Sequence, residues 1–170
     1  FFSLNFKEIW QYRDLLFLFV KRDIITVYKQ TVLGPLWYLI QPLFTSITFT
    51  IIFNNVAGIK TGSIPPFLFN LGSIMVWNYF TSCLSGTSDT FKANAGIFGK
   101  VYFPRAIVPL SITASNLFQF GIKLLLMLVF ITIMGLLPKI NLLALALPGL
   151  IVLMALISMG LGMIVSSMTT

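Results

Sequence analysis

Four consecutive residues inside an apolar stretch combine aromatic and amide side chains: Trp77, Asn78, Tyr79 and Phe80. A flat aromatic face suits the apolar C–H face of a sugar ring, and an amide suits its hydroxyl groups. At about 1.5 Å per helical residue, they lie roughly 15 to 20 Å along a helix that begins near Pro65, which is deeper than an outer aromatic belt. The combination predicts a carbohydrate path, with an inner aromatic belt or plain packing as the alternative interpretation.

Two other apolar stretches carry polar residues on one side. With a helical period, one face of the first holds Trp37, Gln41, Phe44, Thr48 and Asn55, and one side of the second holds Thr113, Asn116, Gln119 and Lys123. Polar faces in lipid need partners, and lysine is costly in hydrocarbon, so neither side is expected to face lipid. Lys123 lies about 27 Å of helix beyond Arg105, near the outer leaflet. We expect it either to snorkel or hydrogen-bond between helices, or to line a hydrated passage.

The residue inventory excludes most catalytic chemistries. Histidine is absent, which excludes imidazole metal sites and histidine-based acyl transfer. The acidic residues are Glu8, Asp14, Asp23 and Asp89. None lies deep inside an apolar run, which argues against a carboxylate proton relay or an aspartyl protease. The single cysteine, Cys83, is interpreted as a small buried hydrophobic residue. No catalytic or metal-binding residue is predicted.

Residues 96–101 resemble a phosphate-binding loop only superficially. A Walker A loop needs four residues between its glycines and a serine or threonine after its lysine. Here two residues separate Gly96 from Gly99, and Val101 follows Lys100. The chain is therefore predicted to have no ATPase site of its own.

Composition identifies the solvent of this chain. Its 170 residues are 58% hydrophobic and 9% charged, with a mean hydropathy of +0.98. A soluble domain draws roughly a quarter of its residues from Asp, Glu, Lys and Arg. Because the apolar residues also lie in long unbroken runs, the predicted fold class is an all-α integral membrane protein.

The positions of charges and prolines divide the chain, a single transmembrane domain over residues 1–170, into its elements. We predict an amphipathic interface helix at 5–30, membrane spans at 33–56, 65–88, 106–137 and 142–168, and a cytoplasmic segment at 89–105. Gly34-Pro35 is expected to form the elbow between the interface helix and the first span, and Pro148-Gly149 to bend the last span.

Small residues recur every fourth position near the end of the last predicted span, at Ser158, Gly162 and Ser166. This spacing lets two membrane helices approach closely, although it also occurs by chance.

The distribution of cations predicts the orientation. Lys7, Arg13, Lys21, Arg22 and Lys29 precede the first span, and Lys92, Lys100 and Arg105 lie between the second and third spans. The two opposite links hold only Lys60 and Lys139, so the N-terminus is predicted to be cytoplasmic. The formal net charge of +7 reflects this topology and contact with anionic membrane lipids, and it does not require nucleic acid as a partner.

Three segments resemble a known family. Residues 20–24 (VKRDI), 28–37 (YKQTVLGPLW) and 40–43 (IQPL) resemble the N-terminal signature of permease subunits of ABC transporters that export O-antigen and related polysaccharides. Residues 94–105 (NAGIFGKVYFPR) are similar to a second signature of this type-2 exporter family, and residues 77–80 match a looser third.

The resemblance implies a homodimer in the bacterial inner membrane that exports a polysaccharide linked to polyprenyl diphosphate. ATP and magnesium would belong to a separate nucleotide-binding subunit. The residues that would contact it form a coupling segment: Asn94, Ala95, Gly96, Ile97, Phe98, Lys100 and Arg105. The interface helix, which includes Arg22, Asp23 and Tyr28, would also contact this subunit.

The resemblance also implies a channel lined by aromatic and polar side chains. The candidates are Trp37, Gln41, Trp77, Asn78, Tyr79, Phe80, Asn116, Gln119 and Lys123. The family has six spans, so its C-terminal part is expected to lie beyond Thr170. An ABC exporter of drugs or another lipid, and a membrane scaffold without transport activity, remain the alternative interpretations.

Overall fold

The computed structural model describes residues 6–29, 32–136 and 142–169, and every regular element in this part of the chain is helical. The elements are α1 (Phe6–Gln11), α2 (Arg13–Lys29), α3 (Pro35–Phe49), the π-helix η1 (Thr50–Val56), α4 (Pro66–Ser88), α5 (Thr90–Ala93), α6 (Ala95–Phe98), α7 (Ile107–Ile133) and α8 (Leu142–Met168). The predicted all-α membrane fold is confirmed.

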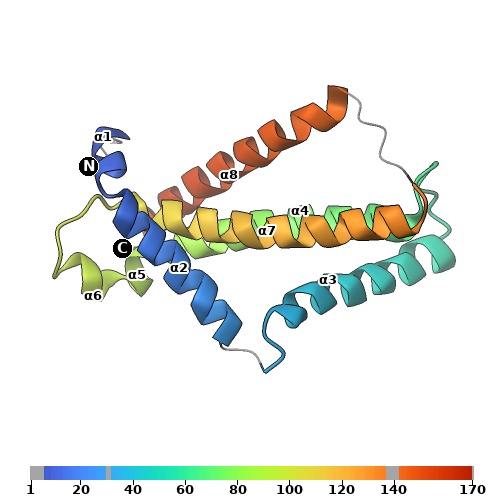
Figure 1. Ribbon diagram of the computed structural model, residues 1–170, viewed down its shortest axis with the longest axis horizontal. Helices are drawn as coiled ribbons and strands as arrows, with labels where there is room; N and C mark the ends of the chain where they lie inside the picture. The colour runs from blue at the N-terminus through green and yellow to red at the C-terminus, as the bar shows by residue number, and fades with distance from the viewer. Residues whose placement is uncertain (1–5, 30–31, 137–141, 170) are drawn as a thin grey trace.

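Helix α4 is the centre of the arrangement, because α3, α7 and α8 all pack against it (Figure 1). The residues of α4 that are buried recur every third or fourth position, as one helical face requires. They are Leu68, Leu71, Met75, Tyr79, Cys83 and Thr87. The interface helix α2 packs against α7 at one end of the bundle, where α5 and α6 also lie (Figure 1).

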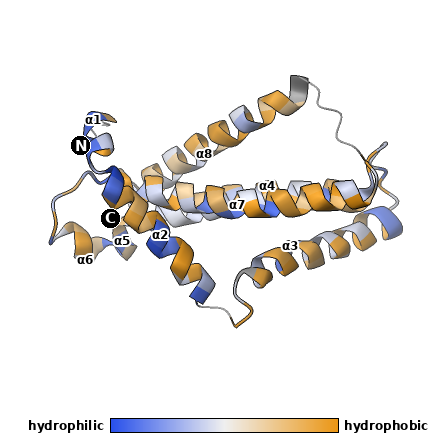
Figure 2. Ribbon diagram, viewed as in Figure 1, coloured by the Kyte–Doolittle hydropathy of each residue, from blue (hydrophilic) through white to orange (hydrophobic). Residues whose placement is uncertain are grey.

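Three helical stretches of the described residues are long and apolar enough to cross a membrane: Leu36–Val56, Ile107–Ile133 and Ala144–Met168. Figure 2 shows hydrophobic residues dominating α3, α7 and α8. The predicted second span forms a helix of 23 residues, α4, but it is more polar than these three. Helix α4 can carry polar side chains such as Asn70 and Asn78 because α3, α7 and α8 pack around it, so that less of its surface faces lipid.

Two of the predicted helices differ from those in the structure. The interface helix is interrupted at Tyr12, which separates α1 from α2, and its predicted ends at residues 5 and 30 lie outside the described residues. Helix α7 ends at Ile133 because Gly135 adopts a φ of 69°. The amides of Gly135 and Leu136 donate to the carbonyls of Thr132 and Ile131 and so close a Schellman motif.

The elbow between α2 and α3 lies where it was predicted. Gly34 adopts a φ of 53°, a left-handed conformation that strains residues with a Cβ, and Pro35 begins α3. A glycine at this position therefore permits the sharp change of direction between the interface helix and the first span.

The π-helix η1 continues α3 and was not predicted from the sequence. It is attached to α4 by side-chain hydrogen bonds: the Asn70 amide donates to Thr50 Oγ1 and to Asn54 Oδ1, each at 3.1 Å. One turn earlier, the Ser46 hydroxyl donates to the Phe67 carbonyl at 3.0 Å. Because η1 has a wider turn than an α-helix, the predicted face that runs from Trp37 to Asn55 cannot be extrapolated with an α-helical period.

Close packing of α8 on α4 confirms the prediction from the small-residue spacing. Ser158 and Ser166 are buried, and the Thr87 hydroxyl lies 3.5 Å from the Ser158 carbonyl oxygen. A Cβ placed on Gly162 would lie 2.7 Å from Thr87 Cβ and closer still to the Thr87 hydroxyl. Pro148 lies inside α8 as predicted.

Gly162→Ala is therefore expected to destabilise the protein, by about 1–3 kcal/mol, because the added methyl group forces α8 away from α4. Gly160→Ala is the matched control, since no atom lies within 4 Å of a Cβ at that position of the same helix. Thermal unfolding of the purified protein in detergent measures both. Equal unfolding temperatures for the two variants would contradict the close contact.

Candidate functional site

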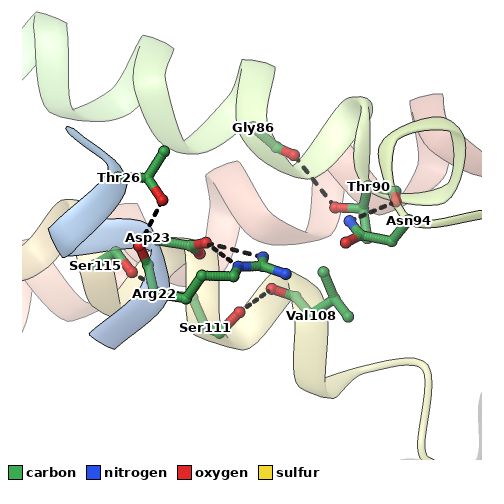
Figure 3. Close-up of polar contacts among 9 residues, drawn as sticks. All are labelled: Arg22, Asp23, Thr26, Gly86, Thr90, Asn94, Val108, Ser111 and Ser115. Carbon is green, nitrogen blue, oxygen red and sulfur yellow. Dashed lines mark hydrogen bonds and ion pairs between the residues drawn. The ribbon is translucent and has the colours of Figure 1, made fainter. Parts of the chain in front are cut away.

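The predicted coupling segment folds as two single-turn helices, α5 and α6, directly after α4. Thr90 and Asn94 are buried here: the Thr90 hydroxyl donates to the Gly86 carbonyl at 3.2 Å, and the Asn94 amide donates to the Thr90 carbonyl at 3.0 Å (Figure 3). These bonds attach the segment to the end of α4. Movement of the segment would therefore be transmitted directly to the central helix.

Four phenylalanine rings connect the coupling segment to the interface helix. The ring centroids are 5.8 Å apart for Phe91 and Phe98, 5.4 Å for Phe98 and Phe103, and 5.9 Å for Phe103 and Phe19 of α2. These separations are those of favourable aromatic pairs. We call Phe19, Phe91, Phe98 and Phe103 the aromatic cluster; it packs α2, α5, α6 and the start of α7 into one unit.

The residues predicted to contact an ATPase subunit separate into inward and outward groups. Asn94 is buried, and Ile97 and Phe98 are half-buried against the cluster around Phe103 and Ile107. The outward group consists of Ala95, Gly96, Lys100 and Arg105. Tyr102, which was not among the predicted residues, is 93% exposed beside Val101. The available signal for it was an aromatic residue beside glycines and cations in a link that is predicted to be cytoplasmic.

The predicted interface residues lie on α2, near α7. The Arg22 guanidinium is bonded to Asp23 Oδ1 at 2.9 Å (Figure 3). It also lies 4.8 Å from the centre of the Phe19 ring. This arrangement fixes the arginine beside the aromatic cluster. Tyr28 is half-buried near the end of α2.

A narrow polar cavity lies between α4 and α7. It is lined by Met75, Asn78, Tyr79, Ser82, Asn116, Gln119, Phe120 and Lys123. The structure thus brings together five predicted channel residues from two helices and adds Ser82, which the sequence analysis missed. The cavity volume is about 10 Å³, room for about one water molecule. The buried Tyr79 hydroxyl has no hydrogen-bond partner among the described residues, and water is a suitable one.

Lys123 lies beside the beginning of α3, although its distance from Arg105 along the chain predicted a position near the other end of the bundle. Its ammonium group lies 5.7 Å from the centre of the Tyr38 ring, which belongs to the first turn of α3. The first part of α7 instead packs against α2, so this part of the helix lies beside the interface helix. The side chain of Lys123 therefore lies about one helical turn from the elbow, next to the beginning of the first candidate span.

The other predicted channel residues lie apart from this cavity. Trp77 and Phe80 line an open groove between α4 and α8 with a volume of about 730 Å³, together with Gly72, Ser73, Val76 and Met154. Trp37 and Gln41 are exposed on α3. The residues proposed for one channel thus occupy three separate surfaces of a single copy of the described chain.

The aromatic cluster predicts a contrast between two adjacent positions. Phe103→Ala removes a buried ring and is expected to cost about 3–5 kcal/mol, whereas Tyr102→Ala removes an exposed ring and is expected to cost less than about 0.5 kcal/mol. Thermal unfolding of the two purified variants provides the comparison. A similar loss of stability in both would show that the cluster does not hold this end together.

Comparison with known proteins identifies the family to which the chain belongs. The family model described as ABC-2 type transporter matches residues 14–170. The chain is 29% identical over 123 residues to the O-antigen export system permease protein RfbA of Myxococcus xanthus, which covers 72% of the chain and 46% of that relative. It is 30% identical over 129 residues to a protein of the same name from Klebsiella pneumoniae, and this alignment covers 75% of the chain and 49% of that relative.

The chain thus spans about half the length of these curated relatives. No solved structure matches it. Because the family match extends over nearly the whole chain and agrees with its apolar helices, the protein belongs to the ABC-2 type transporter family.

Proposed function

We propose that this chain is part of a permease that exports a polysaccharide linked to polyprenyl diphosphate, such as O-antigen, across the bacterial inner membrane. A separate ATPase subunit drives export by binding to the coupling segment, and the N-terminus is cytoplasmic. The permease works as a dimer of two copies. The similarity to O-antigen export permeases supports the class of substrate.

One observation carries this proposal: the coupling segment presents an exposed basic and aromatic surface while its other side is buried. Lys92, Lys100 and Tyr102 are exposed, and Phe98 packs against Phe103 behind them. A docking surface needs outward side chains on a rigid support, and the aromatic cluster supplies that support. A force applied to this surface would reach both α4 and α2.

The separation of the predicted channel residues supports a dimer. In one copy of the described chain, the Gln41 side chain of α3 is exposed on a helix that is otherwise apolar enough to span a membrane. Polar groups in hydrocarbon are costly, so this face requires protein or water opposite it. A second copy, with the rest of each permease, would enclose the path between such faces.

Matched charge reversals on opposite sides of the proposed membrane test the docking surface. Lys100→Glu is expected to reduce co-purification of the ATPase subunit, because it reverses an exposed charge in the coupling segment. Lys60→Glu, in the opposite link, is expected to leave it unchanged. The measurement is the ratio of ATPase to full-length permease after affinity purification from membranes. Wild-type ratios for Lys100→Glu and Tyr102→Asp together would refute docking at this segment.

Sugar stacking in the groove between α4 and α8 is tested at Trp77. Trp77→Ala is expected to lower surface polysaccharide about two- to tenfold, because it removes an exposed ring, while Trp77→Phe retains most of it. Phe69→Ala is the control, since Phe69 is exposed on the same helix outside the groove. Tyr79→Ala is less informative, because Tyr79 is buried against Phe120. Unchanged polysaccharide with Trp77→Ala would exclude stacking at this position.

A further inference from the structure

Lys123 is a cation within the membrane-spanning helix α7, and it has no counterion in the described part of the chain. The ion pairs found there join neighbouring residues of α2. The acidic residues of the whole sequence lie in α1, in α2 and just after α4: Glu8, Asp14, Asp23 and Asp89. A cation inside a membrane is costly without an anionic partner, so the partner of Lys123 is expected to come from elsewhere.

The side chains around Lys123 form a suitable binding site for an anion. Asn78, Asn116 and Gln119 line the same cavity, and an amide NH₂ group donates hydrogen bonds to anionic oxygens. The Tyr38 ring lies against the ammonium group at 5.7 Å and stabilises its charge without neutralising it. Ammonium and amide donors in one place are typical of sites that bind phosphate.

The position of this cluster in the bundle indicates where the anion comes from. The Lys123 ammonium group contacts the first turn of α3, next to the Gly34-Pro35 elbow and the end of α2, which carries the last cations before the span. In the proposed orientation the elbow lies at the level of the cytoplasmic headgroups, where lipid phosphates are abundant, and the Lys123 side chain lies about one helical turn inside the membrane from it. The cavity holds about one water, so the anion would bind at its mouth rather than inside.

We propose that Lys123, with Asn116 and Gln119, binds the phosphate of a lipid headgroup at the cytoplasmic entrance between α4 and α7. The identity of that lipid as the diphosphate-linked substrate rests on the function proposed above. An ordinary anionic phospholipid offers the same chemistry, and the experiment separates the two sources. The site would hold the diphosphate group while the attached glycan enters the path.

The test uses the full-length permease in phosphatidylcholine nanodiscs, titrated with radiolabelled polyprenyl diphosphate. Lys123→Gln removes the charge and retains a polar side chain, and it is expected to weaken binding about tenfold or more. Lys123→Arg retains the charge and is expected to bind within about threefold of wild type. Lys60→Gln, a cation in the opposite link, is the matched control and is expected to bind as wild type does. If Lys123→Gln does not fold, Lys123→Met replaces it.

Phosphatidylglycerol as a competitor separates the two sources. Weak competition supports the diphosphate lipid as the ligand. Competition as strong as that of unlabelled polyprenyl diphosphate would overturn this assignment in favour of an ordinary phospholipid.

Equal affinity of wild type and the charge-removing variants would overturn the site itself. Loss of stability in these variants with unchanged lipid affinity would also overturn it, since it would show that Lys123 pairs with a carboxylate of the remaining permease. Surface polysaccharide in a strain lacking the permease is scored separately. A normal amount of surface polysaccharide in that strain would refute the proposed export function. The proposed site at Lys123 would then be tested by the binding measurement alone.

Discussion

The structure depends on one constraint: polar groups placed in hydrocarbon must be covered by protein. Helix α4 carries Asn70 and Asn78, and it meets the constraint by lying among α3, α7 and α8. Asn70 is bonded to Thr50 and Asn54, and Asn78 lines the cavity shared with α7. Close approach at Gly162 covers α4 around Thr87 on the side of α8.

The same central helix connects the two ends of the protein. Its N-terminal end is hydrogen-bonded to η1, and its C-terminal end continues through Thr90 into the coupling segment. The aromatic cluster then joins that segment to α2, whose far end leads to the elbow at Gly34. A displacement of the coupling segment would therefore act on both the central helix and the start of the first span.

Much of the fold could be predicted because burial in lipid demands long apolar helices, and prolines, glycines and charges mark their ends. The elbow at Gly34 and the contact at Gly162 follow from this local chemistry. Much of the candidate site was also predictable: Asn116, Gln119 and Lys123 share a side of one helix, and the structure brings them together with Asn78 and Tyr79, which were predicted from another. Ser82, Tyr102 and η1 were missed, since none has a strong signal of its own.

By itself, the sequence determined the solvent, the helices and the family, because hydrophobic runs and local motifs act over short stretches of chain. Only the tertiary structure decided which face of each helix is covered. It turned Phe98 inward and Tyr102 outward, separated Trp77 from Asn78, and placed Lys123 beside Tyr38. These outcomes depend on how helices distant in sequence pack, and a residue's depth and exposure are properties of that packing rather than of its neighbours along the chain.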